Sequence, residues 1–244
     1  TVTFTVTDDS GGSDSQSLSV TVKAWAIRMD DVTGANTLFV LGGNGNDNIE
    51  LKQITTYTFT LKLNSVTETI TSTNPVIEHI VVYGNDGDDT ITILDVTDLR
   101  TEVYGGAGND VIVGGDYQNI LVGGDGNDTI SGGRRDLIIG GHGSDTLYGG
   151  ERQDVLVAGA TLWDNNRVAL WAIMSEIVYS GHDYPTRVKH LRNGTGLTNG
   201  YALNASTIVD NHIDTVLGQA ERDYFIVSTG DTTDKKSDET RDFV

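Results

Sequence analysis

The chain contains no cysteine, and it is poor in several other residue types that would define a common class of protein. Without thiols, neither a disulfide framework nor a thiolate metal site can hold it together, so oxygen ligands are what remain for a metal. Basic residues are scarce, 16 against 35 acidic ones, which gives a formal net charge of −19. Such a charge repels nucleic acid and anionic membranes but suits a polyvalent cation, so we expect no nucleic-acid partner.

Long apolar runs are also missing. No stretch of 18 or more apolar residues and no charged-then-apolar leader occurs, so we expect neither a membrane span nor a signal peptide in these residues. Hydrophobic residues make up only 37% of the 244 residues, a low share that a repeat fold tolerates. Proline occurs twice but glycine 30 times, and the glycines are periodic, which argues against a disordered linker.

The glycines mark a repeat of the form Gly-Gly-x-Gly-x-Asp-x-aliphatic-x. Tandem copies occupy residues 105–113, 114–122, 123–131, 132–139 (one residue short), 140–148 and 149–157, and upstream copies lie at 42–50 and 84–92. The aliphatic eighth positions, which we expect to fill the core, are Ile49, Ile91, Ile112, Leu121, Ile130, Ile138, Leu147 and Leu156. Over roughly residues 40–157 the pattern resembles the RTX, or hemolysin-type, calcium-binding repeat. The resemblance implies a mainly β fold, a right-handed parallel β-roll in which each nonapeptide is a ligand loop followed by a short strand.

The same resemblance implies calcium ligands. Ca²⁺ takes six to eight oxygens in flexible geometry, and glycine allows a loop to turn its carbonyls inward. In the RTX family the ligands are the sixth-position aspartate and nearby loop carbonyls. Carried over by position, the implied carboxylates are Asp47, Asp89, Asp110, Asp128 and Asp145. The implied carbonyls are those of Gly42, Asn44, Gly84, Asp86, Gly105, Ala107, Gly123, Asp125, Gly140 and His142.

Intact and degraded copies alternate along residues 105–157. The first, third and fifth copies are intact (GGAGND, GGDGND, GGHGSD), whereas the second, fourth and sixth have lost the third glycine or the aspartate (GGDYQN, GGRRD, GGERQD). Because alternate copies share one edge of a two-sheet roll, we predict that calcium stacks mainly on one edge, as roughly four ions between the intact loops. Three arginines of the degraded loops stand where ligands would be, namely Arg134, Arg135 and Arg152, and they lie beside Asp136, Glu151 and Asp154. Their guanidinium groups either replace calcium or are solvated surface charges.

One sheet of the predicted roll is apolar on its outer face. Its outward positions are Phe39, Leu41, Val81, Tyr83, Glu102, Tyr104, Ile120, Val122, Leu137, Ile139, Val155 and Val157. A strand that is apolar on both faces is buried on both faces, so something must cover this sheet. We predict that a helix over residues 164–180, about 25 Å long, covers it. The alternatives are a neighbouring subunit or the chain excursion that follows residue 53.

Three parts are expected along the chain. Residues 1–26 alternate as strands at 1–7 and 18–22 and resemble the last hairpin of an Ig-like or cadherin-like sandwich, so we expect a fragment of a longer polypeptide. Residues 27–157 are the calcium-binding roll, with a strand excursion near residues 53–78. Residues 158–244 form an α+β cap with helices over 164–180 and 184–192, strands at 201–209, 214–217 and 223–227, and a degenerate repeat at 218–226.

No catalytic constellation is found, since the histidines are isolated and neither HExxH nor GxSxG occurs. The leading hypothesis is therefore a non-enzymatic module that is secreted to the cell surface or extracellular matrix of a Gram-negative bacterium, as a stalk, adhesin end or assembly unit, and that folds on calcium binding. A second hypothesis is a secretion and folding appendix of an upstream extracellular enzyme, such as a protease or lipase. A third is a homo-oligomer or polymer formed through the N-terminal strands or the apolar sheet.

Overall fold

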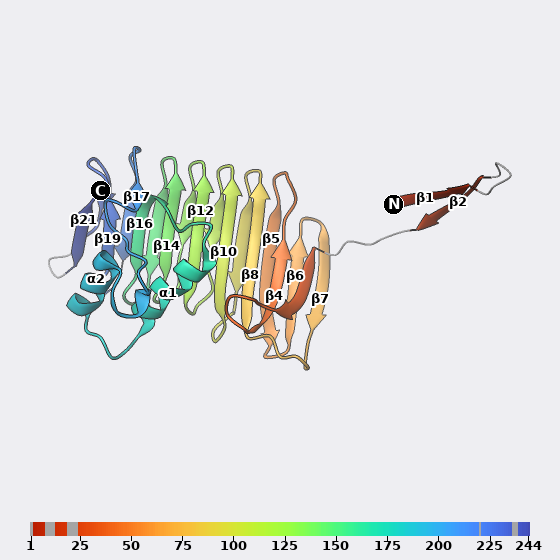
Figure 1. Cartoon of the computed structure of the whole chain (residues 1–244), viewed down its shortest axis with the longest axis horizontal. Coiled ribbons are helices and arrows are strands. Elements are labelled where there is room, and N and C mark those ends of the chain that lie inside the picture. Colours follow the sequence, from red (N-terminus) through yellow and green to blue (C-terminus); the bar gives the residue numbers. More distant parts are fainter. Residues whose placement is uncertain (1, 8–12, 19–23, 220, 236–238) are drawn as a thin grey trace.

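The computed structural model describes residues 2–7, 13–18, 24–219, 221–235 and 239–244. Its main body is a stack of coils in which the chain passes alternately through two sheets, and the coils follow one another along the long axis of the molecule (Figure 1). Neighbouring strands in the repeat region are parallel. The predicted mainly β fold, a parallel β-roll, is confirmed.

We call one sheet the cap sheet because the helices lie against it. From the C-terminal end its order is β21 (Thr240–Phe243), β19 (Tyr224–Val227), β16 (Val155–Thr161), β14 (Leu137–His142), β12 (Asn119–Asp125), β10 (Arg100–Ala107), β8 (His79–Asp86), β4 (Asn36–Leu41) and β3 (Trp25–Met29). The other, the open sheet, has the order β20 (Thr232–Thr233), β18 (Thr215–Gln219), β15 (Thr146–Gly150), β13 (Thr129–Ser131), β11 (Val111–Val113), β9 (Thr90–Leu94), β5 (Asn48–Thr55), β6 (Thr58–Leu63) and β7 (Val66–Thr71). The strands β3, β6 and β7 pair antiparallel with their neighbours.

The core between the sheets is built from the eighth positions of the repeat. In the open sheet Ile112 pairs in register with Ile91 and Ile130, and in the cap sheet Leu121 pairs with Ile138. All of these side chains are completely buried. Because every coil contributes one aliphatic side chain per strand at the same height, the core is a continuous column that needs few hydrophobic residues per repeat.

The chain excursion near residues 53–78 extends the open sheet. It forms the meander β5–β6–β7, whose Phe59, Leu61 and Ile70 enter the main core. It therefore does not cover the apolar outer face, and that alternative is wrong. At the N-terminal end, β1 (Val2–Thr7) and β2 (Ser13–Leu18) form a two-stranded antiparallel sheet. The expected strand at 18–22 differs from β2, and residues 19–22 lie outside the described residues.

The cap contains α1 (Arg167–Val178), α2 (Tyr184–Asn193), the 3-10 helix η1 (Gly196–Thr198) and β17 (Ile208–Val209). The helix expected over 164–180 is shorter, because Asp164 accepts hydrogen bonds from Thr161 in a turn and Asn166 caps the helix. Its length is about 18 Å, too short to cover the sheet alone. The helix expected over 184–192 is present and ends at Gly194, which has φ +65°. Of the strand expected at 201–209, only β17 forms, against β16.

Both helices cover the outer face of the cap sheet from β12 to β19. One cluster joins side chains of these strands, Ile120, Val122, Leu137, Ile139, Val155, Val157, Tyr224 and Ile226, to side chains of the helices, Leu170, Ile173, Met174, Ile177, Tyr184, Val188 and Leu191. The second helix supplies the coverage that the short first helix lacks. The apolar face over these strands is thus buried within the chain, which removes the reason to expect self-association there.

Glu102, the one charged residue among the predicted outward positions, anchors the first helix. The guanidinium of Arg167 donates to Oε2 of Glu102 at 2.6 Å and to both oxygens of Asp30, at 3.0 and 2.6 Å. The indole Nε1 of Trp171 donates to Oε1 of Glu102 at 2.5 Å. Asp30 and Glu102 are both buried. The start of α1 is therefore fixed to β10 and to the β3–β4 turn by a charged, hydrogen-bonded cluster.

Candidate metal centre

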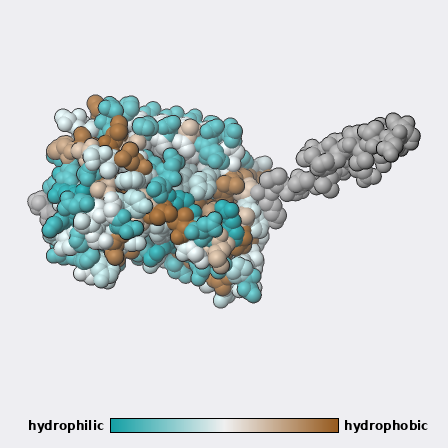
Figure 2. Space-filling view, viewed as in Figure 1, coloured by the Kyte–Doolittle hydropathy of each residue, from teal (hydrophilic) through white to brown (hydrophobic). Residues whose placement is uncertain are grey.

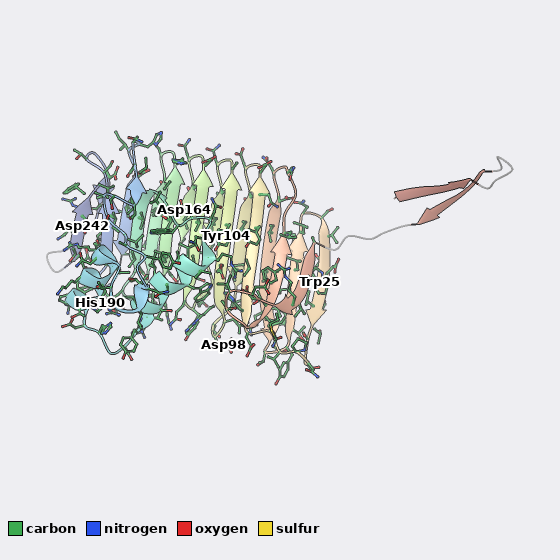
Figure 3. All side chains as sticks on the ribbon, in the orientation of Figure 1. Trp25, Asp98, Tyr104, Asp164, His190 and Asp242 are labelled. Carbon is green, nitrogen blue, oxygen red and sulfur yellow. The ribbon has the colours of Figure 1, made fainter. Side chains whose placement is uncertain are left out.

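The loops that follow the cap-sheet strands share one edge of the roll, at the top of Figure 1, which we call the first edge. These loops are residues 42–47, 84–89, 105–110, 123–128 and 140–145. Side chains project outward from the loops along this edge (Figure 3), and its surface is mostly hydrophilic (Figure 2). The opposite loops form the second edge.

The sixth-position aspartates of the first edge form a hydrogen-bonded ladder. The backbone N–H of each donates to Oδ1 of the aspartate in the next coil, at 2.7 Å from Asp47 to Asp89 and at 2.8 Å from Asp89 to Asp110, from Asp110 to Asp128 and from Asp128 to Asp145. One oxygen of each carboxylate from Asp89 to Asp145 is thereby held by the backbone. The second oxygen is left facing its own loop.

That second oxygen, Oδ2, is buried and accepts no hydrogen bond from any described residue in Asp89, Asp110, Asp128 or Asp145. Burial raises the pKa of the Asp110 carboxyl to about 6 and those of Asp128 and Asp145 to about 7. A buried carboxylate oxygen without a partner is costly, because it has lost its water and gained nothing in exchange. A cation bound at each oxygen removes that cost.

The first-position glycines leave space in front of these oxygens. A Cβ on Gly105 would collide with Oδ2 of Asp110 and lie 2.7 Å from the carbonyl oxygen of Gly123 in the next coil. The same holds at Gly84, where a Cβ would collide with Oδ2 of Asp89. A carboxylate and a first-position carbonyl thus converge on one small space per coil. Oxygen donors of this kind suit a hard cation such as Ca²⁺.

The third-position carbonyls have a different environment. Those of Ala107, Asp125 and His142 accept backbone N–H groups from the preceding coil at 2.7, 2.8 and 2.7 Å. A carbonyl oxygen has two lone pairs, so this bond leaves one available. The side chains of Asp86, Asp125 and His142 are exposed. Their part as ligands stays a prediction.

A second ladder, not predicted from the sequence, runs through the fifth positions. The backbone N–H of Asp88 donates to Oδ1 of Asn46 at 3.0 Å, that of Asn109 to Asp88 at 2.7 Å, that of Asn127 to Asn109 at 2.9 Å, and that of Ser144 to Asn127 at 2.7 Å. It runs in the opposite direction to the aspartate ladder. In the sequence, the fifth position of each of these loops is Asn, Asp or Ser, and this recurrence of a short side chain with an oxygen atom could have revealed the ladder.

The first loop of the edge differs from the others. Oδ2 of Asp47 accepts the backbone N–H of Gly43 at 2.5 Å, and Oδ1 accepts Nδ2 of Asn64 at 2.6 Å. Both oxygens therefore have protein partners at this end of the stack. The predicted ligand roles of Asp47 and of the carbonyls of Gly42 and Asn44 stay predictions.

The first edge continues into the cap, beyond the site residues predicted from the sequence. The backbone N–H of Asp145 donates to Oδ1 of Asp214 at 2.6 Å, and that of Asp214 donates to Asp231 at 3.0 Å. Carboxylate oxygens of Asp210, Asp214 and Asp231 lie within 4.8 Å of one another, and Oδ2 of Asp214 is buried without a hydrogen-bond partner in the described chain. Burial raises the pKa of Asp214 to about 6. The loops that carry these aspartates lack the glycines of the repeat. In the sequence, an aspartate just before a strand is therefore the one sign that they continue the first edge.

On the second edge, an asparagine takes the place of one sixth-position aspartate. Nδ2 of Asn119 donates to the carbonyl oxygens of Gly115 at 2.9 Å and Tyr117 at 3.1 Å, and to Oδ1 of Asp136 at 2.9 Å. These acceptors are loop carbonyls and a ladder carboxylate, the same kinds of group that converge on the first edge. The amide N–H groups thus supply hydrogen bonds to these acceptor oxygens, and the loop needs no ion.

Arg134, one of the arginines of the second edge, does not enter the ladder. Its Nε pairs with Glu151 at 2.8 Å on the surface, where both side chains are more than half exposed. Arg134 therefore forms an exposed ion pair with the neighbouring coil, and the replacement of calcium by the arginines of this edge stays a prediction. Asp136 is satisfied by Gly133 N–H at 2.5 Å, whereas Oδ2 of Asp154 is buried with no partner among the described residues. Burial raises the pKa of Asp154.

Comparison with known proteins agrees with this geometry. Residues 81–92, 104–134 and 135–160 match the family model of the RTX calcium-binding nonapeptide repeat, with 4 copies. Neither the curated proteins nor the solved structures contain a match to the chain. Among the described residues, no helix is long and apolar enough to cross a membrane.

Proposed function

We propose, from the premise that the roll of this chain belongs to the RTX calcium-binding nonapeptide repeat family, that the chain is a calcium-binding structural module of a secreted bacterial protein. RTX repeats are typical of secreted proteins and generally serve as structural rather than catalytic modules. The observation that carries the proposal is the row of buried carboxylate oxygens without hydrogen-bond partners along the first edge.

The residues that hold the ions are the ladder aspartates and the carbonyls that face them. In the proposed sites, Oδ2 of Asp110 and the carbonyl of Gly123 act together, and the neighbouring coils repeat this pair. Asp214 extends the row into the cap. Bound calcium supplies the positive charge that these oxygens lack. Backbone hydrogen bonds to Oδ1 keep each carboxylate oriented, so the ligands are positioned by the fold itself.

Folding is coupled to calcium in this proposal. Successive coils place carboxylates about 4.8 Å apart, and the chain carries a net charge of −19, so the metal-free stack repels itself. The glycine-rich loops also lose much conformational entropy on folding. The chain would stay unfolded where calcium is scarce and fold where it is abundant, as suits export to the cell surface or extracellular matrix of a Gram-negative bacterium.

Calcium stoichiometry tests the assignment of the ladder. Asp128→Asn keeps an oxygen to accept the N–H of Asp110 but places an amide in the metal space, as Asn119 does naturally. We expect this variant to bind fewer calcium ions than the wild type in equilibrium dialysis, with a native circular dichroism spectrum. Asp116→Asn, an exposed aspartate of the second edge, is the control and should bind as the wild type does. Unchanged stoichiometry and affinity in Asp128→Asn would contradict the proposal.

A further inference from the structure

Outside the loops, three ligand-type side chains meet in the cap, and we call them the His–Glu–His cluster. Glu176 is on α1, His182 is in the connection to α2, and His190 is on α2. Nδ1 of His182 lies 2.7 Å and Nδ1 of His190 lies 2.9 Å from the same oxygen, Oε1 of Glu176. Figure 3 places His190 in the cap, away from the loops of the first edge. The cluster is thus separate from the calcium loops in both place and chemistry.

The surrounding backbone holds the carboxylate in one orientation. Oε2 of Glu176 accepts the backbone N–H of Leu197 at 2.9 Å, and the Glu176 side chain is completely buried. Gly196, with φ +64°, packs so closely that a Cβ there would lie 2.6 Å from Oε2 and collide with Nδ1 of His190. A side chain at residue 196 would therefore displace the cluster. Such support from η1 is the kind of outer contact that positions a metal ligand.

The two imidazoles are arranged around the carboxylate and remain open to solvent. The rings of His182 and His190 meet edge to face, with centroids 4.7 Å apart, and their side chains are 26% and 20% exposed. Burial raises the pKa of Glu176, but the hydrogen bonds from Leu197 and the histidines outweigh it and lower the pKa overall. A buried carboxylate thus faces two ring nitrogens, and the rings that carry them are partly exposed to solvent.

We propose that Glu176, His182 and His190 form a binding site for a divalent transition-metal ion of the Zn²⁺ type. Imidazole nitrogen suits zinc and its neighbours, whereas Ca²⁺ and Mg²⁺ prefer oxygen. Two histidines and one carboxylate make three zinc ligands and leave a fourth tetrahedral position for water. Zinc bonds of about 2.0–2.1 Å separate tetrahedral ligand atoms by about 3.3 Å, so each ring nitrogen needs to move away from Oε1 of Glu176 by only about half an ångström.

The site would join the parts of the cap that cover the apolar sheet. Its ligands come from α1, from the connection between the helices and from α2, and the Leu197 contact adds η1. An ion that binds the folded cap but not the unfolded chain stabilises it by mass action. The inference is independent of the calcium function, because it uses none of the first-edge residues.

Zinc titration of the calcium-saturated full chain tests the site, since excess calcium occupies the oxygen sites. We expect one Zn²⁺ per chain by calorimetry, and visible absorption typical of tetrahedral coordination when Co²⁺ is used as the probe. The variants Glu176→Gln and His182→Asn should weaken zinc binding by about tenfold or more. His182→Asn removes a partly exposed ligand and is the variant of choice for retaining the fold, which circular dichroism checks. His212→Asn, an exposed histidine outside the cluster, is the matched control and should bind zinc as the wild type does.

Three results would overturn the proposal. One is the absence of saturable zinc binding by the wild-type chain. Another is binding that His182→Asn leaves unchanged while its spectrum stays native. The last is an equal loss in His212→Asn, which would show that zinc binds to scattered surface histidines.

Discussion

The side-chain amide of Asn119 donates a hydrogen bond to the carbonyl oxygen of Gly115, 2.9 Å away in the same loop. Asn119 stands at the sixth position of the repeat, where the first-edge loops have an aspartate. An aspartate can only accept hydrogen bonds when it is ionised, whereas the amide supplies donors to the loop carbonyls. The loop therefore replaces the charge of an ion with two N–H groups, and this coil is complete without metal.

Converting this loop back to the repeat should make it depend on calcium. Asn119→Asp removes the N–H donors and leaves a buried carboxylate facing carbonyl oxygens, so at a low calcium concentration that just keeps the wild type folded we expect the free energy of unfolding to fall by about 1–3 kcal/mol. Saturating calcium should restore most of the loss, because the new loop has the donor set of the first edge. Urea denaturation at low and at saturating calcium measures both. An equal loss under the two conditions would show that the loop cannot hold an ion.

The charged cluster at the start of α1 predicts a second effect. Arg167→Met leaves Asp30 and Glu102 buried without their shared cation, and breaking a buried ion pair in this way costs about 3–5 kcal/mol. Denaturant unfolding in saturating calcium should show this loss. The matched control is Arg134→Met, which breaks the exposed pair with Glu151 and should change stability by about 1 kcal/mol or less. Similar effects of the two substitutions would mean that the cluster does not anchor the helix.

The metal-free chain should be more stable in mild acid than at neutral pH. Burial raises the pKa of Asp110 to about 6 and those of Asp128 and Asp145 to about 7, from the ordinary value of 3.8. The folded state then binds protons more tightly than the unfolded chain, so the free energy of unfolding decreases as the pH rises from about 4 to about 7. Burial lowers the pKa of His79 to about 4, and this shift makes the free energy of unfolding increase with pH. His79 is one group, however, whereas several aspartates act in the first sense.

The native β signal in circular dichroism, recorded in chelator at pH 5 and at pH 8, checks this expectation. More of the signal should remain at pH 5. In saturating calcium, where the chain is folded, the urea midpoint should instead be higher at pH 8, because protons and calcium compete for the same oxygens. A metal-free chain that is more stable at pH 8 than at pH 5 would contradict the assignment of the partnerless carboxylates.

The parts of the structure that follow from periodicity could be predicted from the sequence. The roll, the column of eighth-position side chains such as Ile112 and the aspartate row of the first edge all follow from a repeat of nine residues. The cover of the apolar sheet was expected from the outward positions of strands such as β14. Hydrophobic pattern and spacing carry these features, because each residue acts through its place in the period.

Features that depend on single hydrogen bonds were not predictable in this way. The interpretation of Asn119 as a lost ligand missed that its amide fills the loop, and nothing in the spacing distinguishes the two. Asp214 was missed because two helices separate it from Asp145, its neighbour in the ladder, by 69 residues. The first helix starts late because Asn166, rather than Asp164, is its cap. The meeting of His182 and His190 at Glu176 needed the fold of the cap.

The central claim is that the first edge is completed by calcium and that the chain folds with it. Circular dichroism of the full chain at neutral pH, recorded in millimolar calcium, after excess chelator and after calcium is restored, tests it most directly. We predict a native β spectrum with calcium, loss of that spectrum in chelator, and its recovery when calcium returns. A native β spectrum with an unchanged cooperative thermal transition in excess chelator would contradict the claim.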